Sequence, residues 1–332
     1  MNQDIIDAVT HLLGDHCSSA VIQRIEAGQD WRPLWDTLES SGFTDALVSE
    51  AMGGAGLSPA DALGIAICSG QHALPLPWAH TMVARGLLAL HGVAAPSGPI
   101  AIAEPTDTTA TDPISVSVPW GRVADHAVVH HQGQHWLLPA GSAEITPSGG
   151  PGGLDAQWTW PSWPSADAVP LPDAAWTAWA AVTSAALMAG ALEWSFELSM
   201  QYANERIQFG KPISKIQVIQ QQLSVMAEHV FAARMAAQIG WHSPLNQFSL
   251  TALAVAKQRT SEAVTVCAPI AHAVHGAMGF TAEYALQLRT RRLHEWRLHY
   301  GSEQHWARWL GEQWLAHTDD ALGAAMRVLE PQ

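Results

Sequence analysis

One apolar seam in the second half of the chain limits the possible folds more than any other feature. It consists of seven apolar side chains at alternating spacings of three and four residues: Ile216, Ile219, Leu223, Met226, Val230, Ala233 and Ala237. This period is typical of a long helix that packs along its length against other helices. Helical patterns also cover about 173–209, 250–275 and 282–299, with a last helix from Ser302. Because the connections between them are short, the sequence predicts a C-terminal four-helix bundle.

The first two of these helices have recognisable ends. Asp173 and Ser214 can begin them, since short polar side chains cap free backbone N–H groups. Gly210 and Pro212 predict that the first helix ends near Phe209. This helix contains an apolar stretch, 174–192, with no charge over 19 positions. The stretch is mostly Ala, Ser and Thr, so we expect a buried helix rather than a membrane span.

The first half of the chain divides into two regions. Residues 1–95 show helical patterns separated by Gly and Pro breaks. Short runs between 98 and 140 are rich in Ile, Val and Trp, which predicts antiparallel strands, whereas the Gly- and Pro-dense 145–173 reads as loop. The sequence therefore predicts a mainly α protein with an N-terminal helical domain over 1–96, a small β domain and linker over 97–172, and a C-terminal helical bundle over 173–332.

The composition excludes several classes of protein. The 332 residues include 30 acidic and 16 basic side chains, giving a formal net charge of −14. Such a balance argues against nucleic acid or an anionic membrane as a main partner, because both attract clustered Lys and Arg. A content of 48% hydrophobic and 14% charged residues excludes a disordered chain. The first fifteen residues contain no Lys or Arg, so no signal or transit peptide is expected and a cytoplasmic location is predicted.

No metal site is predicted. The three cysteines, Cys17, Cys68 and Cys267, lie too far apart in the sequence to suggest a disulfide framework or a pair of metal ligands. A dense group of histidines occupies positions 126, 130, 131 and 135. On a strand hairpin these side chains divide between two faces, so we expect ordinary exposed histidines.

Three segments, in order along the chain, carry the most specific signal. They are Glu50–Ser58 (EAMGGAGLS), Arg206–Ile213 (RIQFGKPI) and His275–Glu283 (HGAMGFTAE). Together with the helical–β–helical order they resemble the acyl-CoA dehydrogenase family, and the resemblance spans nearly the whole chain. It implies an FAD-dependent oxidoreductase that α,β-dehydrogenates an acyl-CoA thioester. In that reaction a carboxylate removes the α-proton, the flavin accepts hydride, and electrons pass to an electron-transfer flavoprotein.

The resemblance also implies cofactor contacts. In the family, the Arg and Phe of the second segment reach the ADP half of a neighbouring subunit's FAD. The planar guanidinium of Arg206 suits a pyrophosphate and the ring of Phe209 can pack on adenine; a surface ion pair and a core Phe are the plain alternatives. The candidate cofactor-binding residues are Arg206, Phe209, Gly276, Gly279, Ser302 and Gln304.

The expected catalytic base is missing. Tyr300 occupies the usual Glu position, and a phenol with an unperturbed pKa near ~10 is a poor base. The other position used in the family is Ala180 here, which leaves Glu295 and Glu303 as weak candidates. Thr106–Thr109 replaces the Gly-Ser-Asp that should line the flavin, so we expect a reduced antiparallel β domain.

These losses and retentions favour one function. The chain resembles the short, base-less subunits of heterotetrameric bacterial dehydrogenases of the steroid side-chain type. We therefore expect a subunit that contributes ADP-half contacts to a second acyl-CoA dehydrogenase-like subunit, which carries the catalytic Glu, in fatty acid or steroid β-oxidation. Two alternatives stay open: a self-sufficient homo-oligomeric dehydrogenase with a displaced base, and a non-enzymatic assembly subunit without flavin.

Overall fold

The computed structural model describes residues 3–105, 113–316 and 323. The Thr106–Thr109 substitution lies outside the described residues. The chain divides into two compact units. The N-terminal unit comprises Met1–Ile65, Leu74–Thr183 and Pro244–Phe248, and the bundle unit comprises Ala66–Ala73, Ser184–Ser243 and Ser249–Gln332. The three-domain boundaries stay a prediction.

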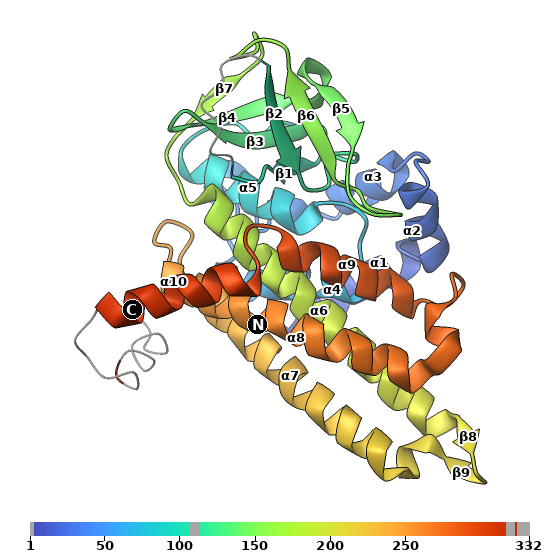
Figure 1. Cartoon of the computed structure of the whole chain (residues 1–332). Helices are drawn as coiled ribbons and strands as arrows, with labels where there is room; N and C mark the ends of the chain where they lie inside the picture. Colours follow the sequence, from blue (N-terminus) through green and yellow to red (C-terminus); the bar gives the residue numbers. More distant parts are fainter. Residues whose placement is uncertain (1–2, 106–112, 317–322, 324–332) are drawn as a thin grey trace. The chain divides into compact units, whose positions relative to one another are not determined.

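Helices form the first part of the chain, and the last of α4, from Ala66 onward, belongs to the bundle unit (Figure 1). They are α1 (Gln3–His16), α2 (Ser19–Glu26), α3 (Arg32–Ser40), α4 (Pro59–Gln71) and α5 (Trp78–Leu90), with 3-10 turns η1 (Phe43–Asp45) and η2 (Glu50–Met52). The sequence patterns did not separate α5 as a helix. Every residue of α5 from 78 to 88 is buried. A helix buried on all sides has no polar face, and therefore shows no helical period.

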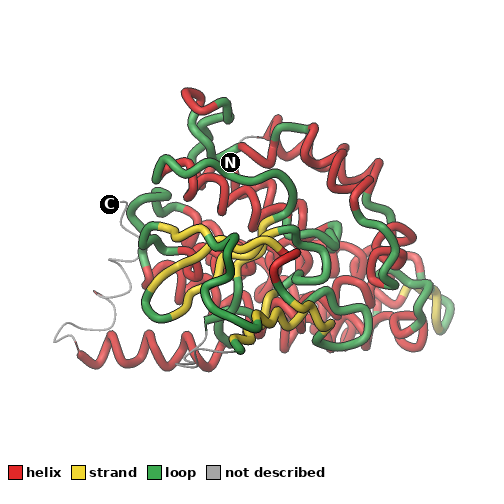
Figure 2. Tube along the Cα trace, turned by 90° about the horizontal axis from the view of Figure 1, so that it is seen from above, coloured by secondary structure: helices red, strands yellow, loops and turns green. Residues whose placement is uncertain are grey.

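Seven strands of the N-terminal unit form two sheets (Figure 2). The four-stranded sheet has the order β1-β3-β4-β7 and the three-stranded sheet the order β2-β6-β5. The strands are β1 (Ile100–Ile102), β2 (Ile114–Val118), β3 (His126–His131), β4 (Gln134–Pro139), β5 (Glu144–Pro147), β6 (Ala156–Trp160) and β7 (Val169–Leu171). Side chains of both sheets share one core that includes Trp158 and Trp160.

Two expectations for this region are wrong. β1 pairs with β3 in parallel, so the β domain is not purely antiparallel. The segment 145–173 is not only loop, because most of β5 and all of β6 and β7 lie within it. These strands are three to five residues long. Between such closely spaced Gly and Pro breaks they are too short to show a clear alternation.

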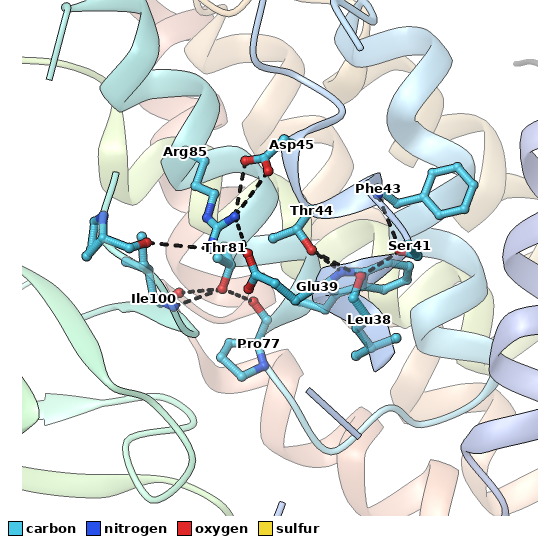
Figure 3. Close-up of polar contacts among 12 residues, drawn as sticks. Leu38, Glu39, Ser41, Phe43, Thr44, Asp45, Pro77, Thr81, Arg85 and Ile100 are labelled. Carbon is cyan, nitrogen blue, oxygen red and sulfur yellow. Dashed lines mark hydrogen bonds and ion pairs between the residues drawn. The ribbon is translucent and has the colours of Figure 1, made fainter. Parts of the chain in front are cut away.

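A polar network ties the helices of the N-terminal unit together (Figure 3). Arg85 of α5 donates to Glu39 of α3 at 2.6 Å and to Asp45 of η1 at 3.1 Å. The Arg85 side chain is only 6% exposed, so these carboxylates compensate a buried charge. Thr81 Oγ1, one turn earlier on α5, accepts from the backbone N–H of Ile100 at 2.9 Å. This second contact fixes β1 against α5.

The bundle unit contains the predicted long helices, except that the start of α6, up to Thr183, belongs to the N-terminal unit (Figure 1). They are α6 (Trp176–Glu205), α7 (Gln217–Trp241), α8 (Leu250–His275), α9 (Leu286–Leu298) and α10 (Glu303–Ala316), with 3-10 turns η4 (Ile213–Lys215) and η5 (Gly276–Phe280). The apolar seam is confirmed, since its members from Leu223 to Ala237 are buried on α7. The mainly helical fold with a small β domain and C-terminal helices is thus the predicted one.

Two glycines let α4 and α6 cross at backbone contact. A Cβ on Gly70 would overlap the carbonyl oxygen of Leu187, and a Cβ on Gly190 would overlap that of Ile67. Both pairs belong to the bundle unit. No other residue type fits at either position.

The predicted ends of the first two bundle helices are wrong. α6 begins at Trp176 rather than Asp173, and it ends at Glu205. A short hairpin follows, in which β8 (Ile207–Gln208) pairs with β9 (Lys211–Pro212). α7 then begins at Gln217, so Ser214 lies in η4 instead of capping the helix.

The apolar stretch of α6 is buried, as predicted: every residue from 179 to 192 is buried. Within the described part of the chain, one helical segment, Leu250–Phe280, is long and apolar enough to cross a membrane. This criterion considers length and composition only, and core helices of globular proteins also meet it.

Candidate functional site

The RIQFGKPI segment forms the hairpin at the tip of α6 and α7 (Figure 1). Phe209 and Gly210 make its two-residue turn, with φ of 53° and 75°. Two positive φ values are those of a primed hairpin turn, a conformation that favours Asn, Asp or Gly and penalises a bulky aromatic residue. Phe209 is nevertheless there, with its side chain 90% exposed. The plain alternative of a core Phe is therefore wrong, and local strain of this kind is typical of functional positions.

Arg206 precedes this turn and is held by backbone and side-chain contacts. Its N–H donates to Tyr202 O and its carbonyl accepts from Ile213 N–H, each at 2.9 Å. With the Gln208 amide oriented so that its oxygen faces the guanidinium, that oxygen accepts from Arg206 Nη2 at 2.7 Å and Nε at 3.3 Å. No ion pair of Arg206 is found among the described residues, and the surface ion pair stays an untested alternative. An oriented, unneutralised guanidinium is suited to bind an anionic group.

A cavity of about 410 Å³ joins this hairpin to the end of α8. Arg206, Gln208 and Tyr202 line one side, and residues 273–278 line the other. Gly276 ends α8 with a φ of 60°, a left-handed value that glycine adopts without strain. The structure therefore brings the predicted residues Arg206 and Gly276 to one cavity.

Gly279 lies behind this wall. A Cβ there would come within 3.0 Å of the Cβ of His275 and 3.3 Å of His272 Nδ1. It thus allows the turn η5 to pack closely on α8 but does not line the cavity. Phe209 does not line it either.

His275 forms part of the cavity wall as a neutral side chain. Its Nδ1 donates to the carbonyl of Ala271 at 2.8 Å, so Nε2 is an acceptor. Burial lowers the pKa of His275, and the hydrogen bond to Ala271 opposes this only in part. The ring packs against Tyr202, with 4.6 Å between ring centroids. Near pH 7 the positive charge of this cavity is thus that of Arg206.

A second cavity, of about 610 Å³, lies on the α9 side of the α8 end. Its lining residues are Ala268, Pro269, His272, Ala273, Gly276, Ala277, Phe280 and His294. It shares Ala273, Gly276 and Ala277 with the first cavity. Sequence reasoning missed His272, Phe280 and His294, although Phe280 belongs to the HGAMGF segment.

Tyr300, at the usual position of the base, is buried. Its side chain is 3% exposed, and its carbonyl accepts from the indole N–H of Trp306 at 3.1 Å. Ala180, at the other position, lies on α6, where its carbonyl is 3.2 Å from His80 Nε2. Neither position offers a carboxylate.

The two substitute carboxylates are both ion-paired. Glu295 accepts from Arg292 at 2.7 Å. Both carboxylate oxygens of Glu303 accept from Arg297, and these hydrogen bonds hold the pKa of Glu303 below its usual range. A carboxylate with a lowered pKa is a weaker base. The geometry therefore disfavours a displaced base at either residue.

Ser302 and Gln304 lie at the start of α10, away from the hairpin (Figure 1). They line neither cavity. Sequence reasoning also missed Lys257 of α8, a fully buried cation near this connection. Its Nζ donates to the carbonyls of Trp296 and Arg297 at 3.0 and 2.9 Å. Lys257 thus caps the last turn of α9 and fixes the start of the connection that carries Tyr300.

The histidine group of the β domain is not exposed, contrary to the sequence expectation. His131 is 1% exposed and the other three are half-buried. Burial is the main cause that lowers the pKa of His135, to about 4, and neighbouring His130 lowers it further. Within the described residues, no group of three or more His, Cys, Asp or Glu side chains is placed to hold a metal ion.

Known proteins share the helical–β–helical order and the C-terminal helices of this chain. Residues 176–313 match the acyl-CoA dehydrogenase C-terminal domain. The acyl-CoA dehydrogenase IpdE2 of Mycobacterium tuberculosis is 28% identical over 300 residues, covering 88% of this chain and 90% of the relative. Residues 176–313 thus carry the C-terminal domain of the acyl-CoA dehydrogenase family, and the chain is similar to an acyl-CoA dehydrogenase over most of its length.

Solved structures show the same fold. In the ChsE4-ChsE5 complex from Mycobacterium tuberculosis, a chain superposes with a TM-score of 0.77 at 19% identity, covering 96% of this chain and 98% of that one. In the Tcur3481-Tcur3483 steroid acyl-CoA dehydrogenase, the TM-score is 0.76 at 21% identity, with 97% and 98% covered.

Proposed function

We propose that this chain is one subunit of a heteromeric, FAD-dependent acyl-CoA dehydrogenase. It contributes contacts to the ADP half of an FAD whose flavin ring is held by a partner subunit that carries the catalytic Glu. One observation carries the proposal. Arg206 lines a cavity at the hairpin and has no ion-pair partner among the described residues, whereas the buried Tyr300 occupies the usual position of the catalytic base. The partner's substrate is an acyl-CoA thioester.

The residues present fit the ADP half of FAD. Arg206 offers a planar cation to a diphosphate, and Gln208 fixes the orientation of that cation. The space beside Gly276 is open, because an added Cβ would meet no atom within 4 Å. Since glycine has no side chain to fill this space, a ligand can approach the backbone at the end of α8. When bound, the flavin supplies the hydride acceptor that no side chain can provide.

The role of this chain in turnover is then to bind and orient. Its own carboxylates do not take part in proton removal, because Glu295 and Glu303 are engaged by Arg292 and Arg297. The exposed ring of Phe209 is presented outward from the hairpin, where it is available to the nucleotide or to the partner subunit.

Relatives support an assembly of two different chains. Two structures that share this fold, ChsE4-ChsE5 and the steroid enzyme Tcur3481-Tcur3483, pair two differently named chains. A steroid-type acyl-CoA is accordingly the proposed substrate class, with an electron-transfer flavoprotein as electron acceptor and the cytoplasm as location. No feature of the site favours a nucleic acid or membrane partner.

The test is co-expression with a neighbouring dehydrogenase-like gene, followed by measurement of mass and flavin per complex. We expect fewer flavins than chains. Arg206→Ala in this chain should lower the flavin content of the purified complex. Lys215→Ala removes a nearby exposed charge that does not line the cavity, and it should leave the flavin content unchanged.

Three results would contradict the proposal. A flavin for every chain would refute the shared site. Yellow colour and brisk acyl-CoA oxidation by the purified single chain would favour the self-sufficient enzyme. Unchanged flavin content in the Arg206→Ala complex would favour an assembly subunit without a cofactor role.

A further inference from the structure

A histidine without a hydrogen-bond partner lies inside the β domain. His131, at the end of β3, is 1% exposed, and neither Nδ1 nor Nε2 has a hydrogen-bond partner among the described residues. Its burial follows from strand alternation, since His131 shares the core face of β3 with Ala127 and Val129, whereas His130 lies on the opposite face. A buried polar group without a partner destabilises the arrangement that buries it.

Two more buried polar atoms without partners belong to the same region. They are the indole Nε1 of Trp136 on β4 and Oγ of Ser165. The ring of Trp163 contacts that of His131, with 5.1 Å between ring centroids, and that of Trp136, with 6.0 Å. Ser165 follows Trp163 by two residues. The unpartnered atoms therefore lie in, or directly beneath, the segment that carries Trp163.

This segment, residues 161–168, connects β6 to β7 and covers His131 (Figure 1). It contains no helix or strand, and five of its eight residues are exposed. The backbone hydrogen bond from Ala168 N–H to Ser165 O, at 3.1 Å, lies within the segment and does not tie it to the sheets. Trp163 and Ala168 pack against the shared core of the two sheets. Segments attached by so few buried contacts open at a small cost in free energy.

A positive charge on His131 opposes the closed arrangement. Burial is the main cause that lowers the pKa of His131, and neighbouring His130 lowers it further. Asp167, the one titratable residue of segment 161–168, is exposed, and β6 contains no titratable side chain. His135 of β4 and the nearby Asp173 lie on the opposite face of the sheet. Among the described residues, no carboxylate is thus placed to stabilise a His131 cation.

We propose that residues 161–168 form a pH-sensitive lid over His131. At neutral pH the histidine is uncharged and Trp163 covers it. Below about pH 6.5, the ordinary pKa of an exposed imidazole, the open form binds a proton that the closed form excludes, so acid favours opening. Opening also removes the cover of Trp163 from the rings of Trp136 and Trp160. The lid is independent of the proposed function.

The test is thiol labelling of Ser165→Cys in the full chain. Ser165 Oγ is buried, so a thiol in its place reacts only when the lid opens. The native Cys17, Cys68 and Cys267 are also buried, and the wild-type protein gives their background rate. The labelling rate with an aromatic disulfide reagent is divided by that of a small free thiol at the same pH. This ratio reports the open fraction and removes the pH dependence of the thiol itself.

The ratio should rise about tenfold from pH 7.5 to pH 5.5, because the exposed imidazole changes from mostly neutral to mostly protonated over this interval. Addition of His131→Phe or of His131→Gln removes the titration, and the ratio should then change less than about twofold. His135→Gln changes the opposite face of the same hairpin and is the matched control, so it should keep the rise. A circular-dichroism spectrum of each variant at both pH values confirms folding.

Other outcomes would overturn the lid. A ratio that stays constant with pH in Ser165→Cys would mean that His131 binds its proton without opening. A rise that persists in a folded His131 variant, or that disappears with His135→Gln, would assign the response to another group. Equally fast labelling of Cys17, between α1 and α2 of the same unit, would show that the whole unit unfolds rather than the segment alone.

Discussion

His135 of the β domain should make the protein lose stability on mild acidification. Its side chain is 14% exposed, its ring packs 4.7 Å from that of His130, and its pKa is lowered to about 4 from the model-peptide value of 6.5. The native state therefore binds fewer protons than the unfolded state between these two values. The contribution of His135 to the free energy of unfolding is therefore complete above pH 6.5. It falls as the pH drops toward 4 and changes no further below that.

The magnitude follows from the two pKa values. A full difference of about 2.5 pH units corresponds to about 3.4 kcal/mol, lost when the pH has fallen below 4. Between pH 7 and pH 5 the loss amounts to about 2 kcal/mol, because part of the titration is still to come at pH 5.

The assay is urea unfolding of wild type and His135→Gln at pH 7 and pH 5. Gln cannot titrate, so the variant should lose about 2 kcal/mol less than wild type over this interval. His11→Gln changes an exposed histidine of α1 and should behave like wild type. An equal pH dependence in wild type and His135→Gln would refute the reasoning, since it would mean that the folded domain protonates His135 at no cost.

Three further predictions concern stability and cofactor binding. Gly70→Ala and Gly190→Ala should each destabilise the protein by about 1–3 kcal/mol or more, because the added methyl group overlaps backbone atoms where α4 and α6 cross. Gly14→Ala, at an open position of α1, should stabilise it by up to about 1 kcal/mol. Thermal unfolding of the three variants measures these changes. Arg85→Ala should cost about 3 kcal/mol in urea unfolding by leaving Glu39 and Asp45 unpaired, and Arg85→Lys should recover part of it. Gln208→Ala should lower the flavin content of the complex less than Arg206→Ala does, and equal losses would contradict a positioning role.

Some residues of the candidate site could be predicted from the sequence, whereas others could not. Arg206 and Gly276 were found from sequence because each belongs to a short motif of unusual composition. His272 and Phe280 were not singled out, although Phe280 stands in the third motif. Their ring stacking depends on how η5 folds back over α8, a contact that no spacing rule describes.

The sequence by itself determined the long helices of the bundle and the small β domain. Apolar periodicity is a local property of each segment, and α7 and α8 follow it. In α5 every face is buried, so the sequence shows no apolar periodicity and the helix is recognised only in the tertiary structure. The tertiary structure alone decided that 206–212 turns back as a hairpin and that residues 70 positions apart, Arg206 and Gly276, line one cavity. These features depend on which side chains come into contact after the helices pack. The free energy of such a contact depends on both segments that form it, so the sequence of one segment does not reveal it.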